Sequence, residues 1–149
     1  MDDVSKIISY IKANNILTVA TVRDGIPWTA SCFYAFDKDR MAFFCLTSLD
    51  TRHGLEMRDN ANVAGTVSSQ QVNVAKIRGL QFSGRALLLE DEEEKAARAI
   101  YYKRFPMARL HSAPIWSISL DVLKYTDNSF GFGTKLHWRR ENEWSKSDR

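Results

Sequence analysis

Residues 47–57 bring phosphate-binding side chains together where the sequence changes from a strand pattern to a helix pattern. The segment reads TSLDTRHGLEM, and its candidate ligands are three hydroxyls, one guanidinium and one imidazole: Thr47, Ser48, Thr51, Arg52 and His53. The first amides of a helix have no partner within it and lie at the positive end of the helix dipole. An arginine fork can bind two oxygens of one phosphate. The segment therefore predicts a site for a phosphate-bearing ligand.

The start of this helix also has an interpretation that needs no ligand. Asp50 and Thr51 are ordinary capping residues, and Arg52 then remains a solvated surface charge. Because capping residues are common at helix starts, spacing alone does not separate the two interpretations.

Three polar residues further along the chain are candidates for contacts to the same ligand: Arg78, Gln81 and Lys135. Arg78 lies either toward a pocket or on the solvent side of a strand. Lys135 follows Phe-Gly-Phe-Gly, and an exposed strand lysine is the simpler interpretation for it. No carboxylate pair or nucleophile triad is evident, so we predict no catalytic side chain.

The cysteines and histidines do not suggest a metal site. Cys32 and Cys45 lie in apolar, strand-like runs, which favours buried thiols over a disulfide in a cytosolic chain. The three histidines are scattered, and their spacing matches no set of zinc ligands.

The composition is that of an ordinary globular protein. The chain has 149 residues, of which 44% are hydrophobic and 26% charged, enough for one sizeable core. Its net charge of +3 permits an anionic ligand but falls short of the basic face expected of a nucleic-acid-binding protein. No apolar run approaches the roughly 18–20 residues of a membrane helix, and no signal-peptide pattern opens the chain. We therefore expect a cytoplasmic protein without nucleic-acid or membrane partners.

Hydrophobic periodicity predicts a chain dominated by strands. Helices are expected to begin near Asp2 or Asp3, at Asp50 or Thr51, and at Asp91; strands are expected at 16–22, 26–36, 41–46, 63–67, 74–89, 116–122 and 130–138. Because hairpins dominate and no βαβ rhythm recurs, the predicted fold class is mainly β, a closed or partly closed barrel with short helices.

Local signals predict some of the connections. Asp24-Gly25 between two strand patterns predicts a tight hairpin. The hydrophobic phase changes near Gly79, which predicts a β-bulge there. Asp91 followed by Glu94 predicts a capping box at the third helix.

Taken in order, these segments resemble the split β-barrel superfamily of pyridoxamine 5′-phosphate oxidase and its FMN-binding relatives. Members carry Asp-Gly-x-Pro and later Thr-x-x-x-Ser/Thr-Arg-Lys; residues 24–27 and the Thr47, Thr51, Arg52, His53 pattern stand in those places. More narrowly, TRHG, VAGTV, IRGLQFSG, RFPMARLHSAPIW and YTDNSFGFG are similar to a group of YhbP-like bacterial proteins. The resemblance covers nearly the whole chain and implies one split-barrel domain, expected over 1–138. Residues 139–149 are polar and mostly charged, and we expect them to form a flexible tail.

The resemblance also implies a function. Relatives bind FMN at the interface of a homodimer, and the phosphate lies at the start of the helix after residue 51. The flavin then carries the redox chemistry, which makes the chain an FMN-dependent oxidoreductase of unknown substrate. The aromatics Trp28, Tyr34, Trp116 and Trp138 are expected in the core or the dimer interface, with one of them a candidate to stack on the flavin.

Two positions depart from the oxidase pattern. His53 stands where oxidase-type relatives carry lysine, and a histidine with a pKa of about 6.5 is charged only part of the time at neutral pH. Gly79 follows Arg78 where they carry Arg-Gln, and the nearest glutamine is Gln81. The oxidase reaction itself is therefore disfavoured.

A second hypothesis belongs to a different functional class. It is a non-catalytic split-barrel dimer that binds haem or another phosphate-bearing small molecule, with His53 and His111 as candidates for a haem contact. A nucleic-acid-binding role would rest only on the basic tail at 139–149, and we do not expect it.

Overall fold

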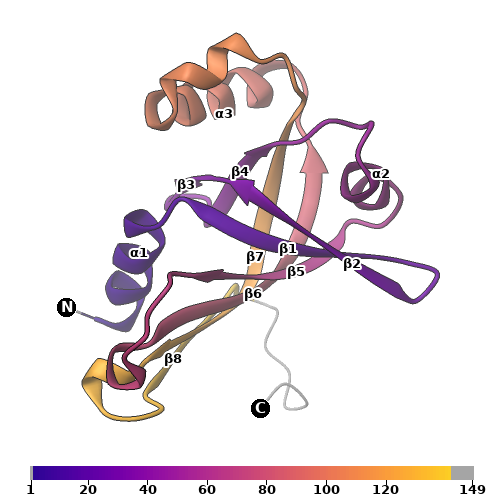
Figure 1. Cartoon of the computed structure of the whole chain (residues 1–149). Coiled ribbons are helices and arrows are strands. Elements are labelled where there is room, and N and C mark those ends of the chain that lie inside the picture. The colour runs from indigo at the N-terminus through magenta and orange to yellow at the C-terminus, as the bar shows by residue number, and fades with distance from the viewer. Residues whose placement is uncertain (1, 142–149) are drawn as a thin grey trace.

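A computed structural model describes residues 2–141 and shows one curled antiparallel sheet with helices around it (Figure 1). The helices are α1 (Asp3–Ala13), α2 (Arg52–Asp59) and α3 (Asp91–Arg104), with short 3-10 turns η1 (Val74–Lys76), η2 (Pro106–Leu110) and η3 (Asn128–Phe130). The strands are β1 (Ile16–Arg23), β2 (Ile26–Phe33), β3 (Ala35–Asp37), β4 (Ala42–Leu46), β5 (Asn62–Ser68), β6 (Arg78–Leu88), β7 (Ile115–Asp127) and β8 (Lys135–Arg139).

The sheet divides at β7, because one edge of this strand pairs with two different strands. The strand order is β2-β1-β5-β6-β7-β4-β3, and β8 also pairs with β7. On that edge, residues 115–119 of β7 pair with β4 and residues 122–126 pair with β8. On the other edge, the register with β6 shifts between Ser83 and Gly84, so Asp121 of β7 is an extra residue. Such a bulge bends a strand, and here it lies where β7 changes partner.

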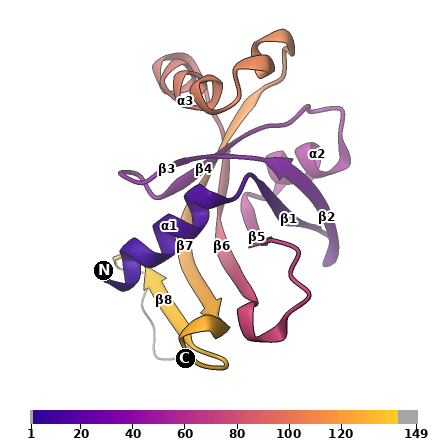
Figure 2. The same ribbon diagram turned by 60° about the vertical axis from the view of Figure 1, so that its left-hand side comes forward.

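The concave face of the sheet carries the main core. Alternate residues of β1, β5, β6 and β7 point inward, and Ile7 and Ile11 of α1 pack among them. A second, smaller cluster lies under α3, where Phe44 and Ile115 contact Ala97 and Tyr101. Figure 2 shows α1 crossing the sheet away from α2. Arg104, the last residue of α3, donates to the Lys12 carbonyl of α1 at 3.1 Å. Within residues 2–141, no helix combines the length and apolar character of a membrane span.

Several sequence predictions are confirmed. Asp2 caps α1 by accepting a hydrogen bond from the Ser5 amide at 2.7 Å. Asp24 and Gly25 both have positive φ, 51° and 74°, as the tight β1–β2 hairpin requires. All but the last residue of β4 are buried, so this strand is covered on both faces. Cys45 is buried as predicted, whereas Cys32 is only partly buried.

The strand predicted at 26–36 is two strands. It breaks at Tyr34, whose amide donates to the Asn15 carbonyl and whose hydroxyl donates to the Ile11 carbonyl. Before the break, β2 pairs with β1; after it, β3 pairs with β4 at the other end of the strand order. Tyr34 therefore fixes the point at which the chain changes partner.

The bulge predicted at Gly79 is wrong. Leu80, Phe82 and Ala86 keep one inward phase through β6, and the irregularity lies opposite Asp121 of β7. The apparent phase change arises because the strand predicted from residue 74 begins only at Arg78, after the η1 turn.

The capping box predicted at Asp91 is also wrong. Asp91 is already the first helical residue, with φ of 55°, and Glu90 precedes it without a capping hydrogen bond from its side chain. The Glu94 carboxylate instead accepts from Arg98 at 2.9 Å.

The end of the domain also differs from prediction. The last strand begins at Lys135 rather than 130, because residues 128–133 form η3 and a glycine turn. It continues through Arg139, and Arg140 donates to the Leu120 and Met41 carbonyls, so the folded part extends past 138. The rest of the predicted tail, residues 142–149, lies outside the described residues.

Candidate functional site

The end of β4 is anchored before the chain reaches α2. The Thr47 amide donates to the Pro114 carbonyl, and the Trp116 indole donates to the Thr47 carbonyl at 3.1 Å. The Thr47 side chain is buried, and its hydroxyl oxygen lies 3.9 Å from the sulfur of Cys32. Thr47 thus positions the segment from the inside of the domain.

The turn into α2 is held by hydroxyl and backbone contacts. The Thr51 hydroxyl donates to the Ser48 carbonyl at 2.7 Å and accepts from the Gly54 amide at 3.1 Å, which caps the helix. The Ser48 hydroxyl oxygen accepts from the Asp50 amide at 3.1 Å. A Cβ at Gly54 would lie 2.3 Å from the Ser48 carbonyl oxygen, so only glycine allows the turn to close this tightly.

Arg52 lies on this turn in a fixed orientation. Its Nε donates to the Glu56 carboxylate at 3.2 Å, one helical turn away. Its guanidinium carbon lies 4.2 Å from the centre of the Trp28 ring, within the range of a cation–π contact. The side chain nevertheless remains about half exposed. The two terminal nitrogens of the fork therefore face a route to solvent while Nε is occupied.

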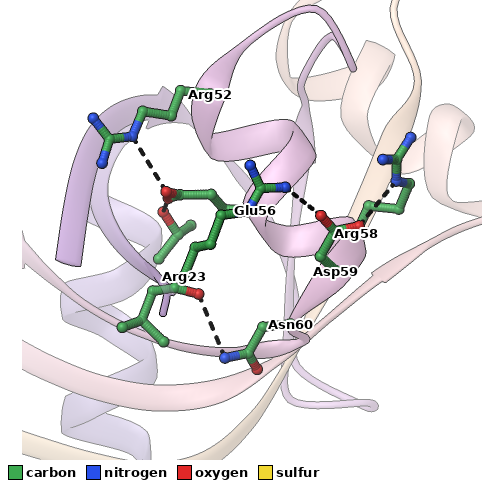
Figure 3. A network of polar contacts seen from close by, with 8 residues as sticks. Arg23, Arg52, Glu56, Arg58, Asp59 and Asn60 are labelled. Carbon is green, nitrogen blue, oxygen red and sulfur yellow. Dashed lines mark hydrogen bonds and ion pairs between the residues drawn. The ribbon is translucent and has the colours of Figure 1, made fainter. Parts of the chain in front are cut away.

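The carboxylate that holds Arg52 is buried between α2 and β1. Thr21 donates its hydroxyl to Glu56 at 2.7 Å, and this bond, followed by the Arg52 contacts, holds the pKa of Glu56 below its ordinary value against the effect of burial. Figure 3 shows the Arg52–Glu56 contact beside a separate group of polar contacts formed by Arg23, Arg58 and Asp59. Asp59 forms ion pairs with both Arg23 and Arg58.

His53 follows Arg52 and is partly buried. Burial lowers its pKa, and the nearby Glu56 charge opposes that effect only in part. At neutral pH the imidazole is therefore mainly uncharged, and Arg52 carries the positive charge of this turn.

The structure places the other three predicted residues elsewhere. Arg78 begins β6 at the far end of the sheet, where its Nε lies 3.5 Å from the Asp127 carboxylate. Gln81 points to the solvent face of β6, in register with Thr66 and Lys124. Lys135 is exposed at the start of β8, which lies well apart from α2 in Figure 1 and in Figure 2. Of the eight predicted residues, Thr47, Ser48, Thr51, Arg52 and His53 therefore lie together at the start of α2, and Arg78, Gln81 and Lys135 do not.

Sequence reasoning missed the side chains that orient Arg52. The spacing of Arg52 and Glu56 is that of a helical i,i+4 ion pair, which is a readable signal. That Thr21 reaches Glu56, and that Trp28 covers Arg52, depends on how α2 packs on the β1–β2 hairpin. Sequence periodicity carries no signal for that packing.

Comparison with known proteins identifies the family. Residues 5–126 match the family described as pyridoxamine 5′-phosphate oxidase. A UPF0306 protein of Klebsiella pneumoniae is 45% identical over 95% of this chain and 96% of its own length. The chain belongs to the UPF0306 group of this family.

Solved structures with the same split-barrel fold bind different cofactors. A haem-binding protein from Mycobacterium smegmatis superposes with a TM-score of 0.79 at 17% identity, over 93% of this chain and 58% of that one. A FAD-binding protein from Mesorhizobium loti gives 0.69 at 17% identity, over 82% and 90%. At such identities the similarity shows the fold, and the predicted mainly β split barrel is confirmed. The choice of ligand must be argued from the residues of this chain.

Proposed function

We propose that this UPF0306 protein binds FMN with its phosphate at the start of α2, and acts as a homodimeric flavoprotein oxidoreductase on a substrate still to be found. The observation that carries the proposal is Arg52: a half-exposed guanidinium at a helix N-terminus, pre-oriented by Glu56 and Trp28. A charge whose rotamer is already restrained loses less conformational entropy when it binds an anion.

The residues of the turn fit a phosphate, but they contribute unequally. The Ser48 oxygen already accepts one hydrogen bond, which leaves its hydroxyl hydrogen for a ligand oxygen. The Thr51 hydrogen is used on the Ser48 carbonyl, and Thr47 is buried. Arg52, Ser48 and the first amides of α2 are thus the groups that would hold the phosphate. When bound, the flavin supplies the hydride transfer, and the chain supplies position and electrostatics.

A homodimer would bring further predicted residues to this site. The convex face of the sheet carries the exposed apolar side chains Ile16, Phe33 and Leu87. Gln81 lies on the same face, on the other side of the sheet from Thr21 and Glu56. We infer that this face contacts a second copy, and that Gln81 contributes to the ligand site of the partner protomer rather than to its own.

One observation favours haem as a second candidate. His111 lines an apolar cavity of about 380 Å³, beside Phe33, Leu46 and Phe105. Histidine is an ordinary haem ligand, His111 is exposed where it lines this cavity, and the M. smegmatis neighbour is a haem-binding protein. In this second candidate function the protein would bind haem beside His111, and the α2 turn would not take part.

The first experiment is an absorbance spectrum of the purified protein, followed by fluorescence titration with FMN. We expect a dissociation constant of about 1 µM or below. Arg52→Ala should raise it roughly tenfold or more, because a hydrogen bond to a charged group is lost. Arg58→Ala, which removes an exposed arginine from the other end of the same helix, should leave it unchanged.

The outcomes separate the two candidates. Equal FMN affinity in Arg52→Ala and the parent protein would remove the α2 turn from the site. No flavin binding, together with a Soret band after hemin addition that disappears in His111→Ala, would replace FMN by haem. Light scattering on the same samples tests the dimer: a monomer at micromolar concentration would exclude the shared site.

A further inference from the structure

A second cavity lies between α1 and the ends of β6 and β7. Its volume is about 540 Å³, within the range of small-molecule sites. It is lined by Lys6, Ser9, Tyr10, Ala13, Arg78, Tyr125, Asp127 and Phe130, and contains none of the α2 residues. Figure 2 shows its surroundings, with the η1 and η3 turns side by side below α1. The Asn128 side chain donates to the Val74 carbonyl at 2.9 Å and joins those turns.

The walls of this cavity are aromatic. The rings of Tyr10 and Tyr125 lie 5.0 Å apart at a tilt of 43°, and both residues are buried. The Tyr10 hydroxyl lies within hydrogen-bond distance of the Val67 and Arg78 carbonyls, so its ring cannot swing aside freely. Phe130 also lines the cavity and is more than half exposed. A flat ring would therefore find aromatic neighbours in this cavity.

The polar groups of the cavity carry an excess of positive charge. Lys6 and Arg78 bring two cations, against one carboxylate from Asp127. The Lys6 ammonium lies 5.0 Å from the centre of the Phe130 ring, and no carboxylate within residues 2–141 forms an ion pair with it. Among the described residues, one positive charge of the cavity is therefore left without a counter-ion.

Asp127 is already satisfied by the protein. Its two oxygens accept from the Tyr125 hydroxyl at 2.9 Å, the Ser129 amide at 2.8 Å and the Ser129 hydroxyl at 2.5 Å. Burial acts to raise the pKa of Asp127, but these Ser129 and Tyr125 bonds and the Arg78 charge keep it below its ordinary value. The carboxylate stays ionised and orients Arg78, and it has little capacity left to bind a cationic ligand.

We propose that this cavity binds a flat aromatic acid, with its ring against Tyr10, Tyr125 and Phe130 and its anionic group between Arg78 and Lys6. Arg78 supplies directed donors through the nitrogens that Asp127 does not occupy, and Lys6 supplies the unbalanced charge. The site is separate from the proposed flavin site and does not depend on it.

The test is calorimetric titration of the full chain with 2-naphthoate, with the uncharged 2-naphthamide as its matched probe. We expect Arg78→Gln to weaken 2-naphthoate binding roughly tenfold, and Lys6→Gln roughly threefold, because an ammonium lacks the paired, directed donors of a guanidinium. Arg85→Gln is the control, since Arg85 lies on the same strand but on its exposed face. Saturating FMN should not displace 2-naphthoate.

Any of the following results would overturn the proposal. Absence of 2-naphthoate binding, or equal affinity for the amide, would exclude an anion site. An equal loss in Arg85→Gln would indicate general charge attraction, and displacement by FMN would assign the probe to the flavin site. Lys6→Gln leaves the Asp127 hydrogen bonds intact, so the test survives even if Arg78→Gln fails to fold.

Discussion

The α2 turn and the cavity beside α1 each contain an arginine in contact with a buried carboxylate, but the two carboxylates have different hydrogen-bond partners. In each, a half-exposed arginine contacts a buried carboxylate: Arg52 is 49% exposed beside Glu56 at 2%, and Arg78 is 52% exposed beside Asp127 at 3%. The Arg52 contact measures 3.2 Å, and the Arg78 contact 3.5 Å.

The difference lies in what else each carboxylate binds. Glu56 accepts from one hydroxyl, Thr21, and otherwise depends on Arg52. Asp127 accepts from Tyr125 and twice from Ser129, so it needs Arg78 much less. Arg52 and Glu56 therefore depend on each other, whereas Asp127 orients Arg78 without depending on it. A similar pair of residues thus rests on one arginine in one place and on several donors in the other.

The largest effect on the free energy of unfolding should come from removing Asp127, the carboxylate with more hydrogen-bond donors. Asp127→Ala leaves the buried Tyr125 hydroxyl without its acceptor, and we expect the free energy of unfolding to fall by about 3 kcal/mol. Urea denaturation measures it, with Asp39→Ala in an exposed turn as control. If Asp127→Ala lowers the free energy of unfolding no more than the control does, the hydrogen bonds of Asp127 do not stabilise the fold.

A smaller difference in the free energy of unfolding should distinguish Arg52→Ala from Arg78→Ala. Arg52→Ala leaves Glu56 buried with one donor, so it should lower the free energy of unfolding more than Arg78→Ala does. Adding Glu56→Gln to Arg52→Ala should recover part of the loss, because the unpaired charge is then gone. If urea denaturation gives equal values for the two arginine variants, the proposed difference in dependence is wrong.

The smallest effect concerns pH. The pKa of His53 is lower in the folded than in the unfolded chain, so the unfolded state binds more protons between those two values. Stability should therefore fall as pH decreases below about 6.5, and His53→Gln should remove that part of the decrease. Glu56, whose pKa is also lowered, acts at more acidic pH: its contribution is lost below its ordinary range, and this loss should remain in His53→Gln. Thermal unfolding midpoints measured from pH 7.5 to 3 distinguish the His53 contribution from the Glu56 contribution.

The local elements were readable because their causes are local. The Asp24-Gly25 hairpin, the Asp2 cap of α1 and the start of α2 at Thr51 each depend on residues within a few positions of one another. The errors occurred where a distant partner decides. Tyr34 breaks a strand through its bonds to Asn15 and Ile11, and the bulge predicted in β6 lies instead in β7, at Asp121.

The sequence by itself determined the mainly β class, the family pattern around Thr51 and Arg52, and the presence of cations suited to an anionic ligand. Only the tertiary structure decided which of those cations act together. It placed Arg52 against Trp28 and Glu56, and it carried Arg78 to the opposite end of the sheet, beside Lys6 and Asp127. The physical reason is that strand pairing brings residues together by register rather than by order in the chain. Side chains far apart in sequence therefore meet, while candidates close in sequence are separated by the faces of one sheet.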